Sequence, residues 1–169
     1  NSLKDRIEAI REEAETAVRE GSTCIVLSDK NFSSEKASIP SILTVGAVHS
    51  HLVKHGLRGY CSLNVECSDT MDTHSFAILI GVGATTVNPY LAIDSIYQRF
   101  EKKLFGKSDF ETCVSRFKKS IDAGLLKIMS KMGISVISSY RGGCNFEAVG
   151  LSRAIVSDYF PGMSSRISG

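Results

Sequence analysis

The stretch Leu125–Gly150, LLKIMSKMGISVISSYRGGCNFEAVG, joins the end of a helix to a β-branched run and then to a glycine turn. The apolar residues before Gly133 have helical spacing, and glycine favours the left-handed conformation that ends helices. The run Ile134–Tyr140 is apolar and β-branched, which predicts a buried strand. Arg141–Gly143 would then follow the carboxyl end of that strand, the edge where α/β sheets usually meet their ligands.

The rest of the chain alternates between helical patterns and short apolar runs. The predicted helices span 3–20, 39–55, 73–80, 90–105, 110–132, a segment from about 145, and 152–160. The predicted strands span 23–27, 62–65, 85–88 and 134–140, and the tail 163–169 is small and polar. This alternation is typical of a parallel α/β sheet, so we expect one domain over 1–169, with helices alternating with short parallel strands. Four strands are too few for a closed eight-stranded barrel, which leaves a small open layer or part of a barrel-like domain.

Composition excludes several classes of protein. The formal net charge of +2 over 169 residues is too small to indicate nucleic-acid binding or attraction to an anionic membrane. No apolar run approaches the roughly 20 residues of a membrane span, and no secretory signal is visible. Five scattered cysteines without a signal favour reduced thiols. We therefore expect a cytoplasmic protein, and the start without Met predicts a piece of a longer chain.

Histidines suggest a metal site only weakly. His51 and His55 are four residues apart and share a helix face, as metal-binding pairs do. His49 is rotated away from both, and no Glu stands between the pair, so solvent or interface histidines are favoured. The carboxylates of the first helix, Glu15 among them, are typical of a solvated surface.

The turns after the strands are poor phosphate cradles. The loops Glu66–Thr70 and Asn88–Tyr90 contain no glycine, and a proline removes one backbone donor. Arg141–Gly143 is the exception, since its arginine could bind a carboxylate or phosphate bidentately. The alternative is a tight turn whose Arg141 bonds across a domain contact, and this alternative is favoured. No Gly-x-Ser-x-Gly elbow is present, so the sequence predicts no catalytic, cofactor-binding or metal-binding residue.

Long motifs nevertheless carry a family resemblance. They are CIVLSD (24–29), ASIPSILTVGAVHSHLVKHG (37–56), SLNVE (62–66), HSFAILIGVGATTVNPYL (74–91), GLLKIMSKMGISVISSYRGGCNF (124–146) and SRISG (165–169). With these motifs the chain resembles the C-terminal part of the central domain of the glutamate synthase large subunit. It departs from the family pattern at Ser168, where a glycine is usual, and at Cys144–Asn145, where the family often has Ala-Gln.

The resemblance implies a place in a multidomain enzyme. In that family an amidotransferase domain hydrolyses glutamine, and an FMN-binding barrel with an iron–sulfur cluster makes glutamate from 2-oxoglutarate. The central domain between them resembles the FMN barrel in topology, but here the phosphate-binding glycines are replaced by the Glu66–Thr70 and Asn88–Tyr90 loops. The resemblance therefore implies a cofactor-free connector whose partners are those two domains, inactive as an isolated fragment.

The same resemblance suggests which residues meet the neighbouring domains. The expected domain-contact residues are Tyr140, Arg141, Gly142 and Gly143, with Lys127 and Lys131 as secondary candidates. Separation from its neighbours should expose apolar surface, so we expect that the isolated fragment can self-associate. The alternative is a stand-alone α/β domain that binds an anion or another ligand at the loop Arg141–Gly143.

Overall fold

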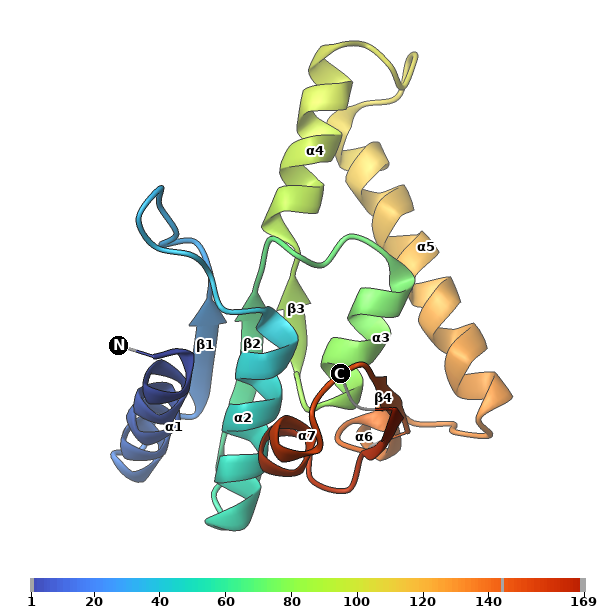
Figure 1. Ribbon diagram of the computed structural model, residues 1–169. Coiled ribbons are helices and arrows are strands. Elements are labelled where there is room, and N and C mark those ends of the chain that lie inside the picture. The colour runs from blue at the N-terminus through green and yellow to red at the C-terminus, as the bar shows by residue number, and fades with distance from the viewer. Residues whose placement is uncertain (1, 144, 168–169) are drawn as a thin grey trace.

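A computed structural model describes residues 2–143 and 145–167 (Figure 1). Its helices are α1 Leu3–Arg19, α2 Ser41–Lys54, the 3-10 turn η1 Arg58–Tyr60, α3 Thr73–Gly81, α4 Tyr90–Glu101, α5 Phe110–Lys131, α6 Ile137–Tyr140 and α7 Arg153–Tyr159. Its strands are β1 Cys24–Ser28, β2 Ser62–Glu66, β3 Thr86–Asn88, β4 Glu147–Val149 and β5 Ser164–Ile167. Within the described ranges no helix is both long and apolar enough to cross a bilayer.

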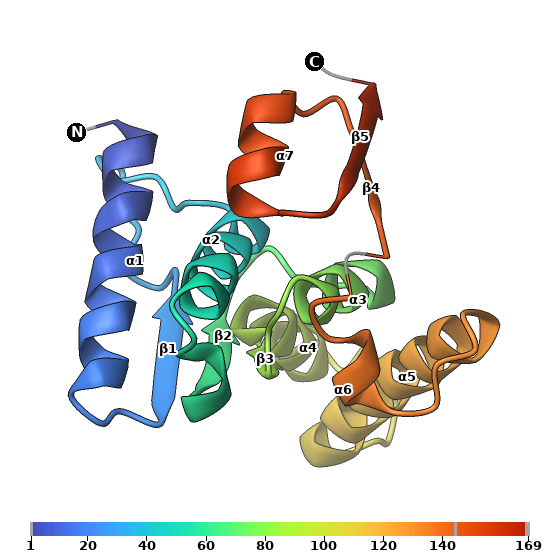
Figure 2. The ribbon, with the colours of Figure 1, turned by 90° about the horizontal axis from the view of Figure 1, so that it is seen from below.

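The main sheet is parallel, with the strand order β1-β2-β3. Leu27 lies opposite Val65, and Val65 lies opposite Val87. The crossover helices α2 and α3 lie on the same side of this sheet as α1 (Figures 1 and 2). On that side Leu63 and Val65 are buried, whereas Val26 on the opposite face is 59% exposed. The predicted α/β fold with short parallel strands is therefore confirmed.

Helix α2 is the centre of the core. Val45, Val48 and Leu52 are fully buried, and they pack in one cluster with α1, the sheet and α7. Gly46 lets α7 approach closely, because a Cβ there would lie 2.3 Å from the ring of Phe160. The helix starts at Ser41, whose backbone N–H donates to Asp69 over 3.0 Å. A carboxylate from the β2–α3 loop thus caps this helix, since Pro40 offers no side-chain cap.

A helical hairpin of α4 and α5 projects from the sheet (Figure 1). Helix α4 ends at Glu101, earlier than predicted, and turns with Gly106 in the left-handed region connect it to α5. The ring of Phe110 meets Tyr97 edge-on with 5.5 Å between centroids. At its other end α5 packs against α3, where Gly124 faces Thr73.

The prediction of a strand over Ile134–Tyr140 is wrong. The segment forms only the single helical turn α6, and Val136 is 52% exposed. The one member of the run that is fully buried is Tyr140, whose hydroxyl donates to the carbonyl of Ala77 over 3.0 Å. Arg141–Gly143 consequently follows a helical turn and does not lie at the carboxyl edge of the main sheet.

The prediction of a helix from about Asn145 is also wrong, and the small, polar tail contains a strand that the sequence did not predict. Glu147–Val149 forms β4, and it pairs in parallel with Ser164–Ile167, which forms β5. Helix α7 connects the two strands, so the end of the chain is a second, separate βαβ unit (Figure 2). The described residues contain five strands in two sheets, where four in one sheet were predicted.

Candidate functional site: the pocket between α2, α7 and the Arg141 loop

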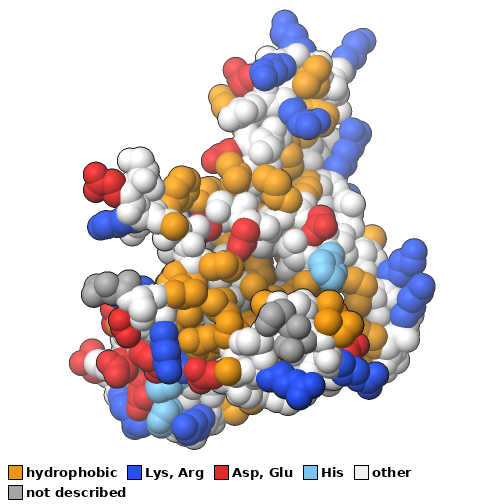
Figure 3. Space-filling view, in the orientation of Figure 1, with side chains coloured by type: hydrophobic (Ala, Val, Ile, Leu, Met, Phe, Trp, Pro, Cys, Tyr) orange, Lys and Arg blue, Asp and Glu red, His pale blue; other side chains and the backbone are white. Residues whose placement is uncertain are grey.

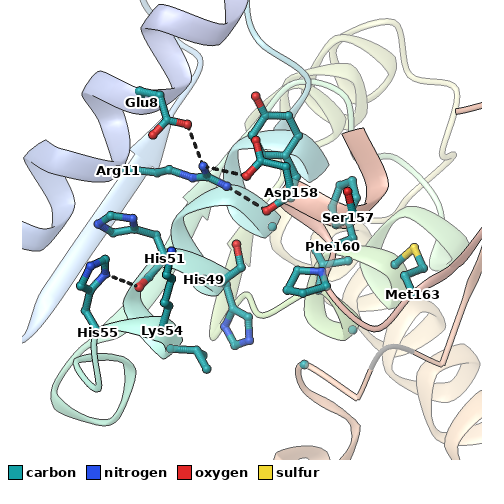
Figure 4. Close-up of a pocket in the computed structure, with 18 residues that line it drawn as sticks. Glu8, Arg11, His49, His51, Lys54, His55, Ser157, Asp158, Phe160 and Met163 are labelled. Atoms are coloured by element: carbon teal, nitrogen blue, oxygen red, sulfur yellow. Dashed lines mark hydrogen bonds and ion pairs between the residues drawn. The ribbon is translucent and has the colours of Figure 1, made fainter. Parts of the chain in front are cut away.

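A pocket of about 640 Å³ lies between α1, α2 and α7 (Figure 4). Its lining includes His49 from α2, Tyr159 from α7 and Gly142 from the turn after α6. We call Arg141–Gly143 the Arg141 loop. The pocket therefore brings together a histidine that the sequence did not single out and the loop that it did.

His49 is held by an arginine from the turn that follows α2. The Nε of Arg58 donates to Nδ1 of His49 over 3.1 Å. The two terminal nitrogens of the same guanidinium donate to the carbonyls of Cys61 and Gly83 over 2.6 and 2.8 Å. Because every one of its nitrogens has an acceptor, Arg58 fixes the imidazole and ties the turn to the start of β2 and to the α3–β3 connection.

Two glycines make room for the imidazole. A Cβ at Gly83 would lie 2.3 Å from Cγ of His49, and a Cβ at Gly142 would lie 2.9 Å from Nε2. Both residues also have positive φ, +128° and +70°, a region that side chains rarely adopt. The glycine in the Arg141 loop is therefore required both by its backbone conformation and by the close approach of His49.

The imidazole of His49 is neutral near pH 7. Burial, with smaller effects from the charges of Arg58 and Arg141, lowers its pKa from the ordinary 6.5 to about 4. Since Nδ1 accepts from Arg58, the proton of the neutral ring is on Nε2, the atom that faces Gly142. A neutral histidine between two guanidiniums avoids a third positive charge at this place.

The two arginines themselves are not neutralised within the described chain. No ion pair between described residues involves Arg58 or Arg141. The charge of Arg141 contributes to lowering the pKa of Arg58, after burial, which is the larger cause. The Nε atom of Arg141 is buried and has no hydrogen-bond partner among residues 2–143 and 145–167. An anion at this position would be stabilised by both guanidiniums.

The opposite wall of the pocket is built on Arg11 of α1. Its side chain is buried and donates to the carbonyl of Ala47 over 3.1 Å and to Glu8 over 2.7 Å. It also binds Asp158 through the backbone carbonyl and the carboxylate, and its guanidinium lies 4.9 Å above the ring of Tyr159. Arg11 therefore joins three helices, and no local signal distinguishes it from its solvated neighbours.

The residues that the sequence predicts as domain contacts differ in how exposed they are. Tyr140 is buried, Arg141 and Gly142 are half-buried, and Gly143 is exposed. Lys127 and Lys131 are exposed on α5, and neither lines the pocket. The structure thus brings the Arg141 loop to His49 but leaves the two lysines apart from it. Tyr140 can serve a contact only by positioning the loop, because its side chain faces the interior.

Polar residues also meet at the carboxyl edge of the main sheet. The carboxylate of Glu66 accepts from Lys30, Ser28 and Asn88 over 2.7, 2.8 and 3.3 Å. These bonds lower the pKa of Glu66, and the hydrogen bond from Lys30 contributes most. The groups at this edge therefore bind one another across the three strands.

One further cluster lies at the rim of the pocket. His51 of α2 and His55, the residue that follows the end of α2, meet Glu15 of α1. Within the described chain, these nitrogen and oxygen atoms form the group that could hold a metal ion. The sequence spacing pairs the two histidines, but it predicts that the carboxylate of Glu15 lies on the solvated surface. Glu15 is half-buried, and it lies 36 residues away from His51.

Comparisons with known proteins agree on one family. Residues 1–152 match the family model of the glutamate synthase central domain. The large chain of an NADPH glutamate synthase from Azospirillum brasilense is 57% identical over 99% of this chain, and that of Bacillus subtilis is 43% identical over 93%. A ferredoxin-dependent glutamate synthase from Pyropia yezoensis is 44% identical over 99%. The matches cover 11%, 10% and 12% of these relatives, so the chain spans about a tenth of their length.

Proposed function

The chain belongs to the family of glutamate synthase central domains, and on this premise we propose that it is a non-catalytic connecting domain of a glutamate synthase. Its partners in this proposal are the amidotransferase domain and the FMN and iron–sulfur synthase domain of the same enzyme. The parent enzyme makes L-glutamate from L-glutamine and 2-oxoglutarate in the cytoplasm. Residues 1–169 form one domain that binds no cofactor of its own.

The main support for a contact with a neighbouring domain is the positive charge at the Arg141 loop. Arg58 and Arg141 lie near each other around a neutral His49, without an ion pair among the residues described. A carboxylate from a neighbouring domain would compensate both charges. The chain on both sides of the loop also exposes large apolar side chains, as protein interfaces do. They are Leu126, Met132, Val136 and Ile137 before the loop, and Val149, Leu151, Ile155 and Ile167 after it.

The main sheet supports a connecting rather than a catalytic role. Ligands of parallel sheets usually bind at the carboxyl edge, where Glu66 of this chain is held by Lys30, Ser28 and Asn88. The strands follow one another in sequence order, with both crossover helices on one side, as in part of a (β/α) barrel. This arrangement supports a partial, cofactor-free relative of the FMN barrel.

The proposal is tested in the full-length enzyme by the substitution Arg141→Ala. We expect glutamine-dependent glutamate formation to fall severalfold while ammonia-dependent formation is unchanged, because the two active sites lose their coupling. Arg99→Ala, on the exposed last turn of α4, is the matched control and should leave both activities unchanged. Unchanged coupling in Arg141→Ala would remove the Arg141 loop from the contact.

A second candidate function rests on the same pair of arginines. A small anion, taken from solution and not from a partner domain, could occupy the pocket beside Arg141 and Gly142. Calorimetric titration of the isolated chain with sulfate and with glutamate distinguishes the two candidates. Binding of either anion that is lost in Arg141→Ala supports the second function. The connecting role predicts no such binding and expects instead that the isolated chain self-associates through its exposed apolar side chains, some of which gather around α2 (Figure 3).

A further inference from the structure

We propose that Glu15, His51 and His55 form a zinc-binding site that joins α1 to α2. Each residue offers one ligand atom, and the three atoms lie within 4.8 Å of one another. Figure 3 shows histidine side chains among acidic and basic ones at the lower left, where the ends of α1 and α2 lie. The site is separate from the Arg141 loop, so it does not depend on the proposed function.

Three potential ligand atoms already lie close to one another. Oε2 of Glu15 lies 2.6 Å from Nε2 of His51 and 3.6 Å from Nδ1 of His55. The two histidines are one helical turn apart, and their ring centroids are 4.3 Å from each other. Ligands at the usual zinc distances of about 2.0 to 2.2 Å lie roughly 3.3 Å apart around a tetrahedral ion. Small side-chain rotations therefore suffice to place an ion between these atoms.

The carboxylate is oriented by a second group. Arg19, one turn further along α1, donates to Oε1 of Glu15 over 2.8 Å, which leaves Oε2 to the imidazoles. The hydrogen bonds from Arg19 and then from His51 lower the pKa of Glu15, so the carboxylate is charged at neutral pH. Hydrogen bonding of a ligating carboxylate by a second residue is usual around protein metal ions.

Without metal, both imidazoles use the facing nitrogen as a donor. Nε2 of His51 donates to the charged carboxylate, and Nδ1 of His55 donates to the backbone carbonyl of His51 over 2.9 Å (Figure 4). To bind a metal, each ring must present the facing nitrogen without a proton, and the bond from His55 to the carbonyl must open.

The donor set selects the class of metal. Two imidazoles and one carboxylate suit zinc, whereas magnesium and calcium prefer oxygen ligands alone. The side chains of His51 and Glu15 are 16% and 21% exposed, so an ion can reach them from solvent. Three protein ligands leave a fourth position for water.

The test is titration of the chain with zinc sulfate, followed calorimetrically at pH 7.5. We expect one zinc ion per chain, and at least tenfold weaker binding in Glu15→Gln and in His55→Gln. His74→Gln is the matched control, because His74 is exposed and lies outside the site. Melting temperatures measured with a chelator present show whether each variant is folded. The zinc X-ray absorption spectrum should contain only nitrogen and oxygen neighbours.

Three results would overturn the proposal. They are no binding by the wild-type chain, equal binding by the folded Glu15→Gln variant, and sulfur neighbours in the absorption spectrum. The last result would assign the zinc to thiols, of which Cys24 is exposed.

Discussion

Two segments for which the sequence predicts a strand, Ser62–Glu66 and Ile134–Tyr140, differ in the structure. The first is the central strand of the main sheet, bonded to β1 on one side and to β3 on the other. The second is a helical turn anchored by one buried side chain, Tyr140. β-Branched residues favour a strand only where neighbouring strands can satisfy the backbone, so the difference comes from the partners rather than from the segment.

Substitution of Tyr140 tests this difference between the two segments most directly. If this residue alone anchors the second segment, Tyr140→Ala should lower the free energy of unfolding by about 4 kcal/mol, as for other buried aromatic residues. Tyr140→Phe keeps the ring against Phe146 and loses only the hydrogen bond to Ala77, so about 1 kcal/mol is expected. Urea denaturation measures both values. Equal losses in the two variants would mean that the ring is not the anchor.

A matched pair of valines sharpens the same comparison. Val65 in β2 is 3% exposed and Val136 is 52% exposed, and both lose the same atoms on substitution by alanine. We expect Val65→Ala to cost about 2.5 kcal/mol because it leaves a cavity, and Val136→Ala to cost under about 0.5 kcal/mol. Chemical denaturation of the two variants side by side tests this. Similar costs would indicate that the second segment is packed as tightly as the first.

The pH dependence of stability tests how the Arg141 loop is packed against α2. The pKa of His49 is about 4 in the folded chain and about 6.5 when unfolded, so the unfolded chain binds more protons between these values. Stability should therefore fall as the pH falls from 6.5 to 4, by about 2 kcal/mol after allowance for solvent screening of the half-exposed ring.

His49→Gln isolates this effect, because the amide oxygen can still accept from Arg58 but cannot be protonated. The difference in unfolding free energy between wild type and this variant should change across that pH range and be constant above it. His74→Gln, which alters an exposed histidine, should show the wild-type pH profile. A wild-type profile in His49→Gln would show that the ring is solvated.

Much of the main sheet could be predicted from the sequence alone. The strands at 24–28, 62–66 and 86–88 were located by apolar runs between turn residues, because a parallel strand shows its burial in a short continuous segment. The helices before and between them carry apolar spacing, and α1 and α3 also have side-chain caps at Ser2 and Asp72. The sequence places Glu15 on the solvated surface because its partner His51 lies 36 residues away in the chain.

The end of the chain could not be predicted in this way. The strands β4 and β5 have three and four residues and pair with each other, and Ala148 is the buried residue of β4, so neither strand carries a periodic signal. The sequence predicts the Arg141 loop after a strand, whereas the structure places it after a helical turn, and its position beside His49 depends on the fold of α2 and α3. Both the pairing of β4 with β5 and the position of the Arg141 loop depend on contacts between distant segments, which the local sequence does not reveal.

Amide hydrogen exchange, compared between the isolated chain and the full-length enzyme, tests the central claim most directly. In the isolated chain the amides of Ser62–Glu66 should exchange slowly. Those of 134–136 and the Arg141 loop should exchange faster, because their bonds, such as Arg141 N–H to Ile137, are isolated turn bonds outside a sheet. In the full-length enzyme the account predicts that the second set becomes strongly protected, because the neighbouring domains cover it, while the first is unchanged. Equally rapid exchange of the Arg141 loop in both forms would contradict its role as a domain contact.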